Sequence, residues 1–182
     1  MLNGCPELLQ EGPLLQVLER SPCDVAVLVP RHEPPEPGPV LVPFTGAEHD
    51  WAAVELGAWI AAAWHSPLRL AGAAADPEKG SGDASRLLAH AALAVQRGLG
   101  VVTEPILISP TARDLLGAAE EAALVVLGVP ERWRREGLGP VRLELARDAP
   151  AAVLLVRRGP RPGGLAPRES LTRFTWSVGR GA

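Results

Sequence analysis

Residues 40–73 read VLVPFTGAEHDWAAVELGAWIAAAWHSPLRLAGA, an apolar run, a long helical pattern and a second apolar run. The first run, Val40–Phe44, predicts a strand, residues 48–65 predict a helix, and residues 68–73 predict a second strand. Parallel strands need a crossover connection of this kind, usually a helix. This stretch therefore predicts the β-α-β unit from which α/β folds are built.

The same alternation continues to residue 156. Leu88, Ala91, Ala92 and Val95 recur at the spacing of one helical face. Further apolar runs predict strands over residues 101–108, 124–127 and 152–156, with helices over residues 112–122 and 141–147 between them. Strictly alternating strands and helices indicate a parallel sheet with both faces covered. We expect a doubly wound α/β fold with a five-stranded parallel sheet.

Two loose segments bound this body. Residues 32–38 are rich in proline and charge, which disfavours regular hydrogen bonding and predicts a linker. Residues 159–182 begin with a run of glycine and proline and form a predicted C-terminal tail. The predicted domain spans residues 39–158, and residues 1–31 precede it as a separate segment.

Residues 1–31 contain an echo of the end of the predicted domain. The run GPLLQVLERSPCDVAVLV, residues 12–29, resembles GPVRLELARDAPAAVLLV, residues 139–156, with a shift of one residue between the two prolines. Both runs have a Gly-Pro start, a helical pattern and a β-rich end. We interpret residues 1–31 as a partial repeat, the last helix and strand of a preceding domain.

The composition of the chain argues against several classes of function. The chain has 182 residues, 47% of them hydrophobic, and a formal net charge of −3, so nothing indicates nucleic-acid binding. Its apolar stretches are shorter than the roughly 20 residues that span a bilayer, and no secretory signal is evident, so we expect a cytoplasmic protein. Cys5, Cys23 and the four histidines lack metal-ligand spacing, so we expect no metal site.

Three motifs resemble the universal stress protein family. VLVPFTG, residues 40–46, is similar to the opening strand of that family, LVVLG, residues 124–128, to its fourth strand, and APAAVLLV, residues 149–156, to its last. The resemblance covers about two thirds of the chain, and the order and spacing of the motifs are more specific than each motif alone. It implies an adenine nucleotide alpha hydrolase-like fold with the extra N-terminal helix and strand attached.

The resemblance also implies a nucleotide site, at Thr45, Gly46, Gly128 and Gly139. Family members often bind ATP through an aspartate after the first strand and a loop of the form G-x-x-G, nine residues, G-[ST]. Here Thr45 replaces the aspartate, Glu131 stands where the second glycine belongs, and Gly139 is followed by a proline, which has no amide donor. We therefore expect a degenerate loop that does not bind ATP in the usual way, with no cofactor, while another nucleotide stays an alternative.

The loop carries the sequence ERWRRE over residues 131–136. Arg132, Arg134 and Arg135 predict an anion-binding or partner-docking patch, because guanidinium groups suit phosphate and carboxylate. The alternative is a solvated turn in which Trp133 packs inward and the arginines pair with Glu131 and Glu136.

The other aromatic residues fall into two groups, one near the predicted helix 48–65 and one in the C-terminal tail. Trp51, Trp59 and Trp64 lie on or near the predicted helix 48–65, and the eight-residue spacing of the first two predicts core packing. In the tail, Phe174, Trp176 and Val178 alternate with polar residues, which is typical of an added strand or a docking peptide, and a disordered end is the alternative.

No recognisable catalytic motif is present, so we expect a regulatory or binding domain and not an enzyme. It would pair through its final strand, either as a homodimer or with residues 23–29 as a tandem pseudo-dimer. Tandem domains of this kind resemble those that follow cation/proton antiporter domains, which would make this chain the cytoplasmic, membrane-tethered regulatory part of a transporter. The alternatives are a stand-alone stress-response protein and a nucleotide or cyclic-dinucleotide sensor.

Overall fold

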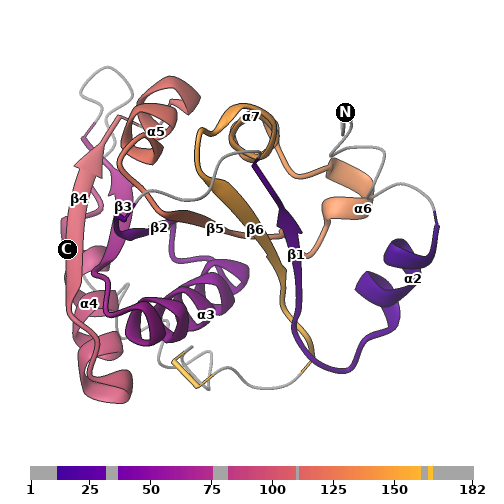
Figure 1. Ribbon diagram of the computed structural model, residues 1–182, viewed down its shortest axis with the longest axis horizontal. Coiled ribbons are helices and arrows are strands. Elements are labelled where there is room, and N and C mark those ends of the chain that lie inside the picture. Colours follow the sequence, from indigo (N-terminus) through magenta and orange to yellow (C-terminus); the bar gives the residue numbers. More distant parts are fainter. Residues whose placement is uncertain (1–11, 32–36, 76–81, 110, 161–163, 166–182) are drawn as a thin grey trace, which may run out of the picture.

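The computed structural model describes residues 12–31, 37–75, 82–109, 111–160 and 164–165. Within these ranges the chain forms one sheet of six strands, with helices on both faces (Figure 1). Cys5, His32 and the alternating aromatic tail, residues 168–178, lie outside the described residues, as does most of the predicted linker.

The helices and strands follow the predicted order. The described strands are β1 (Val25–Val29), β2 (Val40–Pro43), β3 (Leu68–Ala73), β4 (Thr103–Ile108), β5 (Leu124–Gly128) and β6 (Ala152–Arg157). The described helices are α2 (Pro13–Arg20), α3 (Glu48–Trp64), α4 (Ser85–Leu99), α5 (Ala112–Ala119), α6 (Trp133–Glu136) and α7 (Pro140–Asp148).

The sheet confirms the predicted fold class. Its strand order is β1-β6-β5-β2-β3-β4, and the five strands from β2 to β6 pair in parallel. The chain runs from the central strand β2 outward to β3 and β4, then crosses back to β5 and β6. The strand order therefore reverses between β2 and β5, where open α/β sheets bind their ligands.

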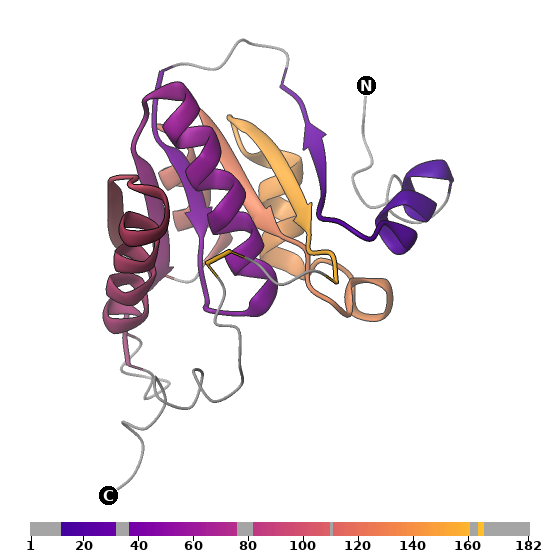
Figure 2. The same ribbon diagram turned by 90° about the horizontal axis from the view of Figure 1, so that it is seen from below.

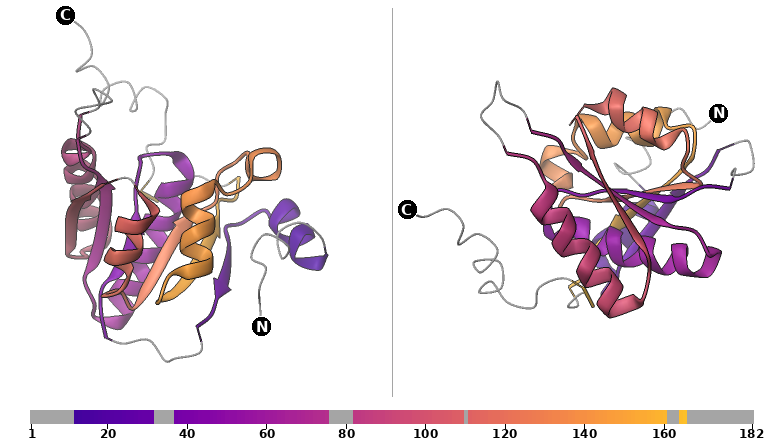
Figure 3. Two further views of the ribbon diagram at one scale, coloured as in Figure 1. Left: turned by 90° about the horizontal axis from the view of Figure 1, so that it is seen from above. Right: turned by 90° about the vertical axis from the view of Figure 1, so that its left-hand side faces the viewer.

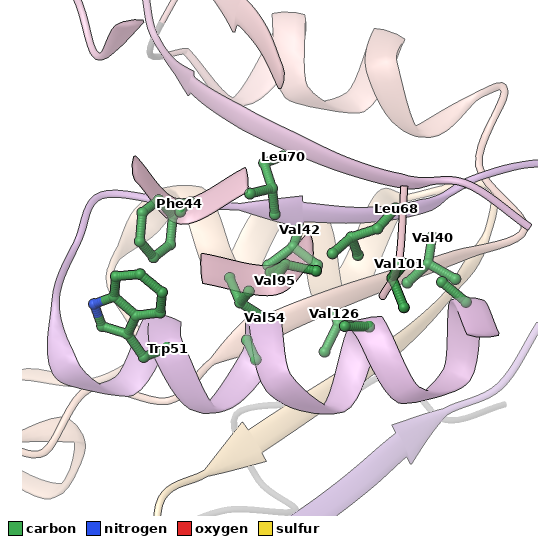
Figure 4. Close-up of a cluster of buried hydrophobic side chains, with 14 of the residues drawn as sticks. Val40, Val42, Phe44, Trp51, Val54, Leu68, Leu70, Val95, Val101 and Val126 are labelled. Carbon is green, nitrogen blue, oxygen red and sulfur yellow. The ribbon is translucent and has the colours of Figure 1, made fainter. Parts of the chain in front are cut away.

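One face of the sheet is covered by α3 and α4 (Figure 2). The alternate residues Val40 and Val42 of β2 point into this layer, and Leu68 and Leu70 of β3 join them (Figure 4). Trp51 of α3 is buried with its ring edge-on to Phe44, at a centroid distance of 5.0 Å and an interplanar angle of 81°. Such aromatic pairs add to the free energy gained from apolar burial.

The opposite face is covered by α5 and α7 (Figure 3). The intervening residues Leu41, Val125 and Val153 point to this side, which explains why the central strands are apolar without alternation. Helix α2 joins this layer through Leu18, which is 2% exposed. The N-terminal segment therefore shares a core with the predicted domain.

The packing prediction for the tryptophans is correct only for Trp51. Trp59 is 47% exposed, so the expectation that it packs in the core was wrong. Trp64, for which the spacing made no prediction, is 50% exposed. Eight residues at about 100° each leave Trp59 roughly 80° around the helix from Trp51. This offset places Trp59 on the flank of α3.

Strand β1 lies along β6 in antiparallel register, with Val27 opposite Leu155. Since β5 occupies the other side of β6, the final strand has no free edge within this chain. The two similar runs each form a helix that begins with proline and then a strand, α2-β1 and α7-β6. Residues 25–29 therefore cover the edge of β6.

Disrupting β1 is expected to change the oligomeric state. Val27 packs against the second core layer, whereas Leu28 is 56% exposed on the other face of the strand. Val27→Asp should detach β1 and open the edge of β6, which favours association. Size-exclusion chromatography with light scattering should show a higher mass than for the wild type, while the control Leu28→Asp keeps the wild-type mass. Equal masses for both variants would argue against this role of β1.

Candidate functional site

A cavity of about 220 Å³ lies where the carboxyl ends of β2, β3, β4 and β5 meet α5 and α7. Its walls are mainly apolar, and they include Phe44, Ala71, Ile108, Leu115, Leu127 and Val141. This is the position at which the strand order reverses, so the fold itself creates the cavity. We refer to it below as the switch-point cavity.

Two polar side chains line the switch-point cavity. Thr45 follows β2, and Arg142 lies in the first turn of α7. Both are held by Asp50, a residue of α3 that is 1% exposed. The carboxylate of Asp50 accepts hydrogen bonds from the Thr45 amide at 2.8 Å and from the Thr45 hydroxyl at 2.5 Å.

Arg142 of α7 also contacts Asp50 and belongs to the same network. Its Nη2 lies 3.3 Å from Oδ1 of Asp50 and 3.0 Å from Nε2 of His49. A buried carboxylate must be paired or hydrogen-bonded, and Asp50 has both kinds of partner. The network therefore fixes the guanidinium of Arg142 at the polar end of the cavity.

The imidazole of His49 belongs to the same network, and its surroundings determine whether it is charged. Burial lowers the pKa of His49, Asp50 opposes this shift, and the positive charge of Arg142 adds to it. The imidazole is therefore neutral at pH 7, and its Nε2 accepts a hydrogen bond from Arg142. The 3.3 Å contact between His49 and Asp50 is then not an ion pair. Arg142 is then the only positively charged side chain of the cluster, and the carboxylate of Asp50 balances its charge.

Gly128, the last residue of β5, packs closely against the backbone at the start of α3. A Cβ at this position would meet the backbone carbonyl of His49, and it would lie 3.0 Å from the amide nitrogen of Asp50. Only glycine allows this close approach, and the contact holds the Asp50 network beside the cavity. Gly128 lines the cavity itself.

Two of the four predicted nucleotide residues, Thr45 and Gly128, line the switch-point cavity. Gly46 and Gly139 do not, although they flank it in the sequence. Gly46 has a φ of 84° and Gly139 has a φ of 82°, so both supply left-handed backbone conformations that favour glycine. Gly139 is the residue before the first turn of α7.

The predicted phosphate loop contains a proline and a short helix. After Gly128 the chain turns through Pro130 into the short helix α6, and Glu131 is exposed there. Helix α7 starts with Pro140, which has no N–H, so the first amides at its N-terminus belong to Val141 and Arg142. Both residues line the cavity.

The predicted arginine patch does not line the switch-point cavity. Arg132, Arg134 and Arg135 line a groove beside α2 that shares no lining residue with the switch-point cavity. Arg132 lies 3.5 Å from Glu136, in line with the solvated-turn alternative. Arg134 pairs with Glu19 of α2 at 2.5 Å, a contact that the sequence did not suggest.

Sequence reasoning missed Asp50 and Arg142. Asp50 reads as an ordinary acidic residue in the first turn of a helix, a position that the helix dipole favours. Arg142 offered a better signal, because a basic residue in the first turn of α7 opposes the helix dipole. An unfavourable charge at that position indicates a specific partner.

The described residues include no group of three or more histidine, cysteine, aspartate or glutamate side chains arranged to hold a metal ion. In the same part of the chain, no helix has the length and apolar character needed to cross a membrane.

The fold is that of universal stress proteins. The universal stress protein from Archaeoglobus fulgidus is 19% identical, with a TM-score of 0.54 over 65% of this chain and 93% of that one. Its complex with dAMP gives a TM-score of 0.55 at 18% identity, over 65% and 97% of the two chains. A universal stress protein in complex with cAMP gives 0.54 at 24% identity, over 67% and 98%. No family model and no curated protein matches the chain.

Proposed function

We propose that this chain is a non-catalytic ligand-binding domain of the universal stress protein type. Its ligand would be a purine nucleoside monophosphate, held in the switch-point cavity, and not ATP. The observation that carries this proposal is the cavity itself, with apolar walls and a single guanidinium, that of Arg142, at its polar end. The related structures with dAMP and cAMP support a monophosphate ligand.

The size and chemistry of the cavity favour a small ligand. At about 220 Å³ it is smaller than the range of about 300 to 1,000 Å³ for typical small-molecule sites, so it would enclose only part of a nucleoside monophosphate. The amides of Val141 and Arg142 and the Arg142 guanidinium provide donors for one phosphate at a helix N-terminus. A triphosphate would extend toward Pro140, which offers no donor, and toward the exposed carboxylate of Glu131.

The same lining argues against catalysis. Among the residues that line the cavity, Arg142 is the only one with an ionisable side chain, and an arginine stays protonated near pH 7 and does not act as a general acid or base. No carboxylate pair lines the cavity, and the one lining hydroxyl, that of Thr45, is hydrogen-bonded to Asp50, whose carboxylate also pairs with Arg142. The domain would therefore report on its ligand through binding alone.

Calorimetric titration of the full chain with adenosine and with AMP tests the proposal. AMP should bind more tightly than adenosine, and Arg142→Met should remove about tenfold of the AMP affinity. Arg147→Met, on the exposed side of the same helix, is the matched control and should leave the affinity unchanged. ATP should fail to displace AMP. Equal affinities of the wild type and Arg142→Met for AMP would contradict the proposal.

We propose further that the domain is the cytoplasmic regulatory part of a cation/proton antiporter. The resemblance to tandem domains in such proteins supports this, together with the α2-β1 pair that pairs with β6 as a second copy would. Sequencing the coding region on both sides of these 182 residues checks it. Transporter helices in the same reading frame would support the assignment, and a complete reading frame without them would remove it.

A further inference from the structure

A large groove lies between α2 and the segment that leads into α6, at the carboxyl end of β6. Its volume is about 1150 Å³, roughly five times that of the switch-point cavity. One wall is formed by residues 18–22, the other by residues 129–135, and the end of β6 closes the base with Arg157 and Arg158. Figure 2 shows α2 and α6 on the same side of the molecule, away from α4.

The groove concentrates positive charge. Six arginines line it against only two glutamates, Glu19 and Glu131, and these arginines are Arg20, Arg132, Arg134, Arg135, Arg157 and Arg158. The whole chain has a net charge of −3, so the groove has the opposite sign to the rest of the protein. Low-dielectric walls around charges of one sign strengthen the field in such a groove.

Several of these arginines are fixed in place by protein partners. Arg158 donates to Glu48 at 2.7 Å, Arg157 donates to the carbonyl oxygen of Ser21 at 3.0 Å, and Arg134 pairs with Glu19. These contacts join three separate segments, so the side chains are held before any ligand arrives. Preorganisation of this kind reduces the entropy lost on binding.

Donor capacity remains after these contacts are counted. Arg20 and Arg135 have no ion pair within the part of the chain that the structure describes. The Nε of Arg158 is buried and has no acceptor there either. A buried donor without an acceptor costs free energy. Arg20 and Arg135 are exposed in the groove, so their guanidinium groups are accessible to a ligand.

We propose that this groove binds a ligand with two or more linked phosphate groups. Guanidinium groups bind phosphate oxygens in a two-pronged geometry, and arginines on α2, α6 and the end of β6 can contact phosphates at separate points. Linked phosphates also bring several negative charges into a small volume, which suits a groove lined by six arginines and two glutamates. The inference does not depend on a ligand in the switch-point cavity.

Titration of the full chain at low salt with orthophosphate, pyrophosphate and tripolyphosphate tests the inference. The affinity should rise along this series and fall as sodium chloride is added, because the interaction is electrostatic. Replacing both Arg20 and Arg135 with alanine should weaken tripolyphosphate binding by at least about tenfold. The control Arg113→Ala, an exposed arginine on α5 outside the groove, should leave binding unchanged.

Four results would overturn the inference. The first is no binding of tripolyphosphate by the wild type, and the second is an equal loss in Arg113→Ala, which would indicate non-specific attraction. The third is binding of an oligoglutamate peptide as tightly as tripolyphosphate, which would identify an acidic protein surface as the partner. Loss of tripolyphosphate binding in Arg142→Met alone would also exclude the groove, while leaving the switch-point cavity as a phosphate site.

Discussion

Replacing Asp50 with alanine is expected to lower the free energy of unfolding by about 3 kcal/mol, because removing one partner of a buried ion pair leaves the other uncompensated. Asp50 is 1% exposed and accepts hydrogen bonds from the amide and hydroxyl of Thr45. It is also the partner of Arg142, whose guanidinium would lose its carboxylate. Chemical denaturation followed by circular dichroism measures the change.

A double-mutant cycle separates this pair from the rest of the packing. Arg142→Met removes the stranded charge, so the double variant should be more stable than the sum of the two single losses predicts. Asp148→Ala is the control, because Asp148 pairs with Arg147 in an exposed ion pair at 2.8 Å. Such surface pairs add little to stability. Equal effects of Asp50→Ala and Asp148→Ala would show that the buried network does not stabilise the site.

Gly128→Ala is expected to destabilise the protein by about 2 to 3 kcal/mol, in the range for overpacking a close contact. The added methyl would meet the backbone of His49 and Asp50, which cannot move away as a flexible side chain could. It would also displace the start of α3 and with it the Asp50 network, so AMP binding should be lost together with stability. Thermal unfolding and calorimetry measure the two effects.

Gly117→Ala provides the matched control. Gly117 lies in α5, and a Cβ added there meets nothing within 4 Å. Alanine is the better helix former by roughly 1 kcal/mol, so this variant should be slightly more stable than the wild type. If Gly128→Ala behaved in the same way, the close contact between β5 and α3 would be contradicted.

The sequence predicted the fold well because apolar runs and helical periodicity coincide in the central strands. Val40–Phe44 and Leu124–Leu127 lie next to each other and are almost entirely buried, as unbroken apolar runs predict for a parallel sheet. The direction of β1 could not be read in this way, since a five-residue apolar strand looks the same in either orientation. The packing prediction for Trp59 was wrong for a related reason, because spacing alone does not show how wide the buried face of a helix is.

The site was only partly predictable. Thr45 and Gly128 follow strands whose ends meet at one edge of the sheet, so their positions came with the fold. The contact between Asp50 and Arg142 joins residues 92 positions apart, and nothing local in either helix specifies the other. Three arginines of the groove beside α2 were predicted as an anion-binding or partner-docking patch, but the groove itself was not, because it depends on the packing of Leu18 into the second core layer.

Chemical-shift mapping of the amide groups during a titration with AMP tests the central claim most directly. The account predicts that AMP shifts the amide signals of Thr45, Ala71, Gly128 and Arg142, which surround the switch-point cavity, and leaves those of Arg20 and Arg135 in place. Shifts confined to the arginine groove, or none at saturating AMP, would contradict a nucleoside monophosphate site at the ends of β2, β3 and β5.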